Sequence, residues 1–419
     1  MATRRRTSPP ATRRRPPATP SRPARAGAGP LTGYRVVELA HHLAGPLGAM
    51  HLGDFGADVV KVESLEGEDW RRWGRASPAG DSQLFLAISR NKRSLSLDLS
   101  TREGRAVLDR LLASADVLLT NYQPGVLRAM KLDARTLARR FPRLIVCSMS
   151  GFGTKGPDPD RRAFDMIVGG ETGLLLLPEG VPAPLINAAP VADTAGALML
   201  AYGVALALLH RERTGRAQAV ETSLASACIA LQAHRFIWLD GEAAPDMTPP
   251  RTIMYRAYAT ADGFVTVAVI AERLWRRLCK ALGFDGLADD PRHADWAKVA
   301  EWQPALRERF EARFRERTTD EWLAVLIAAG VPAGRVQWGA PVFDHPALVA
   351  NGVIMRTRHP RAGAMRTMGF PIAMRDTPAR VRRHAPALGA DSRAVLADLG
   401  YSAAQIRRLV ASKTIRARS

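Results

Sequence analysis

Hydrophobic positions in the first 150 residues follow two alternating patterns. Short apolar runs predict buried strands over residues 34–39, 56–62, 95–97, 117–120 and 144–149. A stretch of small residues over 47–55 predicts a helix, and apolar positions at helical spacing after residue 103 predict another. Ser100 and Glu103 are placed as a capping box, with Ser100 as the first cap of that helix. Strands that alternate with helices predict parallel βαβ units.

Polar and small residues follow three of these strands. His41 and His42 come after the first strand, Asn121 after the fourth and residues 150–153 (SGFG) after the last. Ligands bind outside the carboxyl ends of the strands in such sheets, so these residues are the first candidates for a site. The chain has neither G-x-G-x-x-G nor G-x-x-x-x-G-K-[ST] in this region, which argues against the familiar nicotinamide and nucleoside-triphosphate enzymes.

The most apolar stretch of the chain runs from Thr194 to Leu209 and follows Asp193. It is apolar on all sides, which predicts a central buried helix, with Gly215 near its end. Its 16 residues fall short of the about 20 that a membrane span needs, so no membrane partner is expected. Beyond Pro249 and Pro250, an alternating strand near 258–268 and helical stretches over 272–283 and 301–330 predict a second, smaller α+β domain.

Charge is concentrated at the beginning of the chain. Residues 1–30 hold eight Arg, seven Pro and no acidic residue, which predicts a disordered tail; a nucleic-acid arm and a targeting segment are the alternatives. Without those eight charges the formal net charge falls from +20 to +12, which still favours anionic ligands without distinguishing nucleic acid from a phosphorylated small molecule. Three scattered cysteines without a C-x-x-C pair indicate neither a disulfide scaffold nor a zinc module.

Two aspartates have both a structural and a chemical interpretation. Aspartate is a preferred N-cap residue, and Asp193 precedes the long apolar helix. The same position suits a nucleophile, because the positive end of a helix is expected to keep a carboxylate ionised. Asp165 lies in a polar loop before an apolar segment, where a capping role is expected.

Two other clusters are weaker candidates. His41 and His42 lack a carboxylate at ligand spacing, so no metal site is expected. The basic segment 90–93 (RNKR) is either a solvated turn or a phosphate contact.

Several motifs in order resemble those of the class III CoA-transferase family. They cover roughly residues 31 to 415: LTGYRVVEL at 31–39, AGP at 44–46, GADVVKVE at 56–63, NKRSLSLD at 91–98, NYQPG at 121–125, SGFG at 150–153, RERTGR at 211–216, YATADG at 258–263, APALG at 385–389 and LGYS at 399–402. The resemblance implies an α/β fold. In it, a large Rossmann-like parallel-sheet domain is built from both chain ends (31–235 and 350–419), a smaller α+β domain covers 250–340, and two chains form an intertwined homodimer.

The resemblance also implies chemistry. The family nucleophile falls at Asp193, preceded by Ala192 where the family has glycine. Its carboxylate is expected to take CoA from an acyl-CoA as an aspartyl-CoA thioester and pass it to a carboxylic acid, with backbone amides at the start of the helix stabilising the oxyanions. Expected CoA contacts are His41, Lys92, Arg93, Leu97, Asn121 and Arg128. Two family arginines are replaced, by Ser64 and by Ala129, and Arg128 stands beside the second position.

Two alternatives to a transferase remain. An α-methylacyl-CoA racemase would resemble this chain, but its histidine falls at Phe164, which carries no proton. A CoA-binding or nucleic-acid-binding protein without catalysis is the other. The transferase interpretation implies acyl-CoA and an acceptor acid as partners, no metal, no nucleic acid and a cytoplasmic location. The sequence does not name the donor or acceptor acid.

Overall fold

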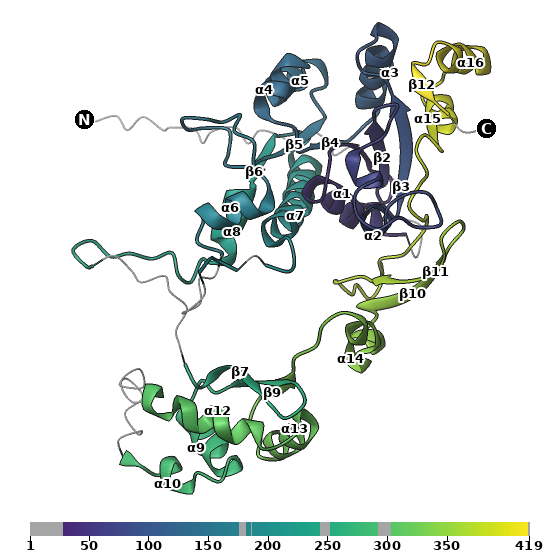
Figure 1. The fold of residues 1–419 in the computed structure, drawn as a ribbon. Helices are drawn as coiled ribbons and strands as arrows, with labels where there is room; N and C mark the ends of the chain where they lie inside the picture. The colour runs from purple at the N-terminus through teal and green to yellow at the C-terminus, as the bar shows by residue number, and fades with distance from the viewer. Residues whose placement is uncertain (1–27, 176–181, 186, 244–251, 292–302, 418–419) are drawn as a thin grey trace, which may run out of the picture. The chain divides into compact units, whose positions relative to one another are not determined.

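The computed structural model describes residues 28–175, 182–185, 187–243, 252–291 and 303–417 (Figure 1). Most of the predicted tail, residues 1–27, lies outside them. The chain divides into two compact units, of which the larger combines residues up to 245 with residues from 352 onward and the smaller covers 246–351.

The larger unit is built on a seven-stranded sheet. Its strands lie in the order β12 (Ile415–Arg416), β3 (Lys92–Leu97), β2 (Asp58–Glu63), β1 (Arg35–Leu39), β4 (Val117–Thr120), β5 (Ile145–Ser150) and β6 (Val220–Ser223). All pairs are parallel except β12 with β3. The predicted parallel α/β sheet is confirmed. The direction in which successive strands are added reverses between β1 and β4, and this switch point is where such sheets bind ligands.

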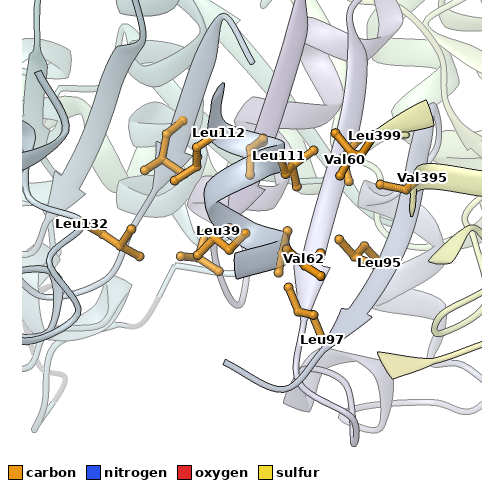
Figure 2. Packing of buried hydrophobic residues seen from close by; sticks show 14 of the residues in the cluster. Leu39, Val60, Val62, Leu95, Leu97, Leu111, Leu112, Leu132, Val395 and Leu399 are labelled. Atoms are coloured by element: carbon orange, nitrogen blue, oxygen red, sulfur yellow. The ribbon is translucent and has the colours of Figure 1, made fainter. Parts of the chain in front are cut away.

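Helices cover both faces of this sheet because its strands alternate their buried side chains. Val37 of β1 packs in one core with α3 (Arg102–Ala113), α15 (Ser392–Asp398) and α16 (Ala403–Ala411). Val36 of β1 packs in the other core with α1 (Ala44–Asp54), α7 (Val191–Thr214) and α8 (Leu224–Leu231). Figure 2 shows the first core, where Leu111 and Leu112 of α3 lie over β1, β2 and β3, with Val395 of α15 and Leu399, the residue after α15, nearby. The remaining helices are α2 (Gln83–Ile88), α4 (Pro124–Ala129), α5 (Ala134–Arg140) and α6 (Asp165–Glu171).

The two ends of the chain meet around the segment before β3. Asn91 has a left-handed backbone, with φ of 62°. Its side-chain oxygen accepts the N–H groups of Arg382 and Arg383, and its own N–H donates to the carbonyl of Arg383. The hairpin β10 (Ile354–His359) and β11 (Gly363–Met368) connects to the same region, because Arg90 donates to the carbonyls of Met368 and Gly369.

The smaller unit has an antiparallel sheet in the order β7 (Tyr255–Ala259), β8 (Phe264–Ala268) and β9 (Ala333–Arg335). Its helices include α9 (Glu272–Ala281), α10 (Asp285–Ala288), α12 (Arg307–Arg315), α13 (Thr319–Ala328) and α14 (Pro346–Ala350). Tyr258, Trp275 and Trp322 form the centre of its own core.

Three local predictions need correction. The helix after β3 is capped by Thr101, whose side chain accepts from the N–H of Gly104, and Ser100 instead bonds to Asp98. The small-residue helix begins at Ala44, three residues before its expected start. The long apolar helix α7 ends at Gly215 as predicted, but in the single chain it is buried on one face and exposes leucines on the other.

Helix α7 is long and apolar enough to cross a membrane by length and composition, and 44% of its most apolar window is buried inside the structure. With its 24 residues, α7 is longer than the 16-residue apolar stretch from which no membrane span was expected, and one such helix is weak evidence for a span. In the structure, α7 packs against α1, α8 and β5.

A buried ionic network lies beneath the turn that follows β1. Lys61 pairs with Glu38 and Glu68, each at 2.8 Å, and Lys92 pairs with Glu38 at 2.9 Å. All four side chains are almost fully buried. Burial alone would lower the pKa of Lys61, but the two carboxylates raise it above its ordinary value. The Lys61 ammonium also donates to the carbonyl of Ala40, so the network holds the chain where β1 ends.

We predict that Lys61→Met lowers the free energy of unfolding by about 3–5 kcal/mol, because it leaves buried Glu68 without its cation and leaves Glu38 with Lys92 alone. Urea unfolding followed by circular dichroism measures it. Arg72→Met is the matched control, since Arg72 and Asp69 form an exposed pair whose loss changes stability by at most about 1 kcal/mol. Equal effects of the two substitutions would contradict a stabilising role for the network.

Candidate active site

A cavity of about 480 Å³ opens at the carboxyl ends of β1, β4 and β5. Its lining includes His41, His42, Asn121, Ser150, Arg162 and Asp193. We call it the Asp193 cavity. The structure therefore brings together the residues that the strand-end rule selected, and it adds Asp193, which comes from the first turn of α7.

A second cavity, of about 440 Å³, lies at the ends of β2 and β3 and is called the Leu97 cavity. Leu39, Val62 and Leu97 give it an apolar wall. Its charged lining residues are all acidic: Glu63, Glu66 and Asp98. His41 and Tyr122 line both cavities and therefore form the boundary between them.

That boundary is a stacked and uncharged pair. The rings of His41 and Tyr122 are 4.8 Å apart and inclined by 7°. Burial and the nearby Lys61 lower the pKa of His41 to about 4, and burial raises the pKa of Tyr122 to about 12. Asn121 holds the backbone of His41 on both sides, since its Oδ1 accepts from the His41 N–H at 3.0 Å and its Nδ2 donates to the His41 carbonyl at 2.8 Å.

His42 sits in a backbone conformation that side chains rarely adopt, with φ of 61°. Its N–H donates to Oε2 of Glu68 at 3.0 Å, and Glu68 belongs to the buried ionic network. Its ring meets the edge of Phe164 at 5.6 Å. The network therefore holds an unfavourable turn, and this turn places the His42 side chain in the Asp193 cavity.

Asp165 connects α6 to the start of α7. Its Oδ1 accepts the N–H of Ala192 at 2.6 Å and the N–H of Asp193 at 3.2 Å. Asp165 thus satisfies the first turn of a helix that begins 26 residues after it in the chain. Asp165 does bind the first turn of a helix, as expected of a capping residue, but that helix is α7.

The structure corrects one expectation for Asp193 and narrows another. Asp193 is not the N-cap, because α7 begins at Val191 and Asp193 lies inside the first turn. The N–H groups of Ala192 and Asp193 already bind Asp165, so they are not free to stabilise an oxyanion.

The carboxylate of Asp193 is also less acidic than expected. Burial, together with the negative charge of Asp165, raises its pKa to about 7. Among the residues that the structure describes, none forms a hydrogen bond or an ion pair with this carboxylate. A carboxylate of this kind is available for reaction and has raised basicity.

Of the other predicted CoA contacts, one lines a cavity and one does not. Leu97 lines the Leu97 cavity beside Ser64. Arg128 lies on α4, half-exposed and paired with Asp160 at 2.8 Å, outside both cavities. Its neighbour Val126 lines the Asp193 cavity.

The basic segment 90–93 is buried, so its interpretation as a solvated turn is wrong. Lys92 pairs with Glu38, and Arg93 pairs with Asp58 and Asp398, each at 2.6 Å. Neither side chain lines the Asp193 cavity or the Leu97 cavity, and both cations are bound to carboxylates of the sheet and of α15.

Sequence reasoning missed two residues of the site. Tyr122 lay within a quoted motif but had no assigned role, and its stacking on His41 depends on two strands meeting in space. Glu68 lies in a polar stretch without a pattern, so nothing in the sequence marked it. Within the described ranges, no group of three or more His, Cys, Asp or Glu side chains is arranged to hold a metal ion.

The parallel sheet has a cavity on each side of its switch point, and one of these cavities holds an unbonded carboxylate. This arrangement is typical of α/β enzymes that bind their ligands at the carboxyl ends of the strands. The model of CoA-transferase family III matches residues 31–392. The chain belongs to this family, and it is a CoA-transferase of the CaiB/BaiF type.

Named relatives and solved structures agree with this assignment. Succinate–glutarate CoA-transferase of Agrobacterium fabrum is 34% identical over 88% of this chain and 96% of its own. Succinyl-CoA:glutarate CoA-transferase of Mus musculus is 31% identical over 92% of this chain and 90% of its own. The crystal structure of a CaiB/BaiF family protein from Brucella suis is 33% identical, with a TM-score of 0.77, and covers 89% of this chain and 100% of its own.

The charge of Asp165 leads to a prediction about pH. The carboxyl group of Asp193 is ionised above its pKa. With Asp193 as the reacting group, as we propose below, kcat/KM for CoA transfer should rise with pH through about 7 and reach a plateau above it. Asp165→Asn keeps an oxygen that accepts from the start of α7 but removes the negative charge, so the pKa of Asp193 falls and the rise moves to lower pH. An unchanged pH profile of kcat/KM in this variant would show that Asp165 does not set the acidity of Asp193.

Proposed function

We propose that the chain transfers CoA from an acyl-CoA to a carboxylic acid through an aspartyl-CoA thioester on Asp193. One observation carries the proposal. Asp193 is the one acidic side chain among the described residues that line the Asp193 cavity, and its carboxylate is not bonded to the protein. A nucleophile needs this freedom, because a carboxylate held by an arginine would be a weaker attacking group.

The reaction needs no net proton transfer. A carboxylate oxygen of Asp193 attacks the thioester carbonyl, the C–S bond breaks, and CoA thiolate leaves an acyl-aspartyl anhydride. The thiolate then attacks the aspartyl carbonyl of the anhydride, which releases the donor acid and leaves the aspartyl-CoA thioester. The acceptor carboxylate attacks that thioester and expels the thiolate, and attack of the thiolate on the acceptor's carbonyl frees Asp193 with the new acyl-CoA.

The two cavities suit the two ends of an acyl-CoA. We place the reacting thioester in the Asp193 cavity and the adenine ring in the Leu97 cavity, whose apolar wall includes Leu97. The acidic residues of the Leu97 cavity disfavour phosphates, so these groups would lie outside it on the side of Arg128. The connecting chain would pass the His41–Tyr122 pair, whose backbone Asn121 fixes.

A homodimer is part of the proposal. In the single chain, α7 exposes Leu198, Tyr202, Leu206 and Leu209, each between 46% and 63%. These residues repeat at helical spacing and form an apolar stripe, and a second copy of the chain would remove it from water. We also propose a cytoplasmic location.

The racemase alternative has less support. Phe164 stands at the position where the resemblance to the racemases implies a histidine, and its ring lines the Asp193 cavity against His42. A phenyl ring does not transfer a proton to or from an α-carbon.

We predict that Asp193→Asn lowers kcat for CoA transfer more than about a thousandfold, since the amide is not a nucleophile. Product acyl-CoA is quantified by liquid chromatography after incubation with a donor acyl-CoA and an acceptor acid. Asp109→Asn is the control, because Asp109 is a partly exposed carboxylate that pairs with Arg140 and lines neither cavity. Undiminished transfer by Asp193→Asn would end the proposal.

A further inference from the structure

Three backbone N–H groups at the start of α7 are not available to an oxyanion. Those of Ala192 and Asp193 bind Asp165, and that of Thr194 donates to the carbonyl of Pro190. Each attack in the proposed reaction places negative charge on a carbonyl oxygen, and enzymes that transfer acyl groups usually meet this charge with fixed hydrogen-bond donors. The Asp193 cavity therefore needs a donor from another element.

His42 offers such a donor. It lines the Asp193 cavity and, within the part of the chain that the structure describes, no hydrogen bond or ion pair holds its imidazole. A neutral imidazole has one N–H donor in either tautomer, and the protonated ring has two. The neighbours of this ring are aromatic, since the ring of Phe164 lies at 5.6 Å and that of His41 at 6.3 Å. An N–H group of His42 is thus available to a ligand.

Two other polar side chains of the cavity already have partners. Asn121 uses its Oδ1 and its Nδ2 on the backbone of His41. The Oγ of Ser150 accepts the N–H of Gly153 at 2.9 Å and so shapes the loop after β5, although its O–H can still donate. Ser150 is therefore the competing donor that an experiment on His42 has to exclude.

The two arginines of the cavity belong to a different part of it. Arg161 and Arg162 directly follow Asp160, the partner of Arg128, and this is the side on which we place the phosphates of CoA. The Nη1 of Arg161 also donates to Glu171 at 2.9 Å. Neither arginine is needed to explain how the thioester carbonyl is bound.

Contacts on two sides hold His42 near Asp193. Its ring meets Phe164, which directly precedes Asp165, and Oδ1 of Asp165 lies 3.2 Å from the backbone nitrogen of Asp193. Helix α1, which begins two residues after His42, packs against α7. His42 also follows His41, which lies on the path that we propose for CoA. The imidazole of His42 is therefore placed to meet the acyl end of a bound thioester.

The backbone of His42 adds a second, independent observation. Its φ of 61° is a conformation that glycine adopts without strain, but the chain has a histidine there. The N–H of His42 donates to Glu68, which pairs with buried Lys61, so the core of the sheet holds the strained turn. Strained residues that are fixed in this way gather at functional sites. The strain therefore points to a use of the His42 side chain.

We propose that the imidazole of His42 donates a hydrogen bond to the thioester carbonyl and stabilises the oxyanion that forms when Asp193 attacks. The inference rests on the proposed function, since it takes Asp193 as the nucleophile. During the attack, the electron pair of the C=O bond moves onto the oxygen that the His42 N–H binds. It returns to the C=O bond when the C–S bond breaks, and His42 keeps its proton throughout.

The test uses His42→Gly, which removes the side chain and leaves a residue that accepts the φ of 61°. Transfer of CoA is measured between acetate, propionate and succinate and their CoA thioesters. We expect kcat to fall about 100-fold and KM for the acyl-CoA to stay within about threefold, because the hydrogen bond strengthens mainly in the transition state. Added imidazole should restore part of the lost kcat and leave the wild-type rate unchanged.

A second measurement needs no turnover. Asp193→Ala cannot form the anhydride, so acetyl-CoA labelled with carbon-13 at its carbonyl can be observed in the bound state. Its carbonyl infrared band should lie at a lower wavenumber than in free acetyl-CoA, because a hydrogen bond to the oxygen weakens the C=O bond. This shift should disappear when His42→Gly is added to Asp193→Ala.

His51→Gln is the matched control, since His51 lies in the last turn of α1 and lines neither cavity. It should leave kcat and the response to imidazole unchanged.

Three results would overturn the inference: an unchanged kcat in His42→Gly, a loss carried by KM alone, or a carbonyl band that does not depend on His42. The first would point to the hydroxyl of Ser150 instead. If the wild-type protein transfers CoA among none of the three acids, the proposed function fails, and the infrared comparison still decides whether His42 binds the carbonyl.

Discussion

The contact between Asp165 and the first turn of α7 is the constraint on which the site depends. One carboxylate oxygen accepts the N–H groups of Ala192 and Asp193, and this fixes the backbone of Asp193, the residue that we propose as the nucleophile. The same charge, added to burial, raises the pKa of Asp193 to about 7. Asp165 therefore influences both the position of the Asp193 backbone and the pKa of the Asp193 carboxyl. To change the pKa without moving the backbone, a substitution must keep the side-chain oxygen of Asp165 and remove its charge.

The opposite wall of the Asp193 cavity depends on charges inside the sheet. Lys61 binds Glu38 and Glu68, and Glu68 in turn accepts the N–H of His42. Asn121 fixes His41 from the neighbouring strand. The turn after β1 is thus held by buried groups that pair with one another. An enzyme whose substrate must be oriented against a carboxylate gains from such rigidity, because little ordering is left to do when the substrate binds.

Sequence reasoning succeeded where the chemistry follows from local pattern. The apolar runs predict the parallel strands, and the rule for strand ends leads to His41, Asn121 and Ser150, which line one cavity. It failed where the deciding partner is distant in the chain. The cations of segment 90–93 look exposed in sequence, but Asp54, Glu38 and Asp58 bury them from 35 or more residues away.

The same limit applies to the two aspartates and the two arginines. Asp193 resembles an N-cap until α7 is seen to start two residues earlier, and Asp165 resembles a cap of its own helix until it is seen to serve another. Nothing in the sequence distinguishes Arg161 from Arg162. Arg161 differs from its neighbour only in the folded chain, where it pairs with Glu171. Local patterns therefore give the positions of such residues, and their roles depend on contacts that only the folded chain makes.

The most direct test for an aspartyl-CoA thioester on Asp193 is the mass of the intact protein after brief incubation with an acyl-CoA, followed by treatment with hydroxylamine and peptide mapping. We predict a CoA adduct that hydroxylamine converts to a hydroxamate on the peptide containing Asp193. CoA transfer between acids without any adduct or hydroxamate on this peptide would contradict it, since the reaction would then proceed without the aspartyl-CoA intermediate.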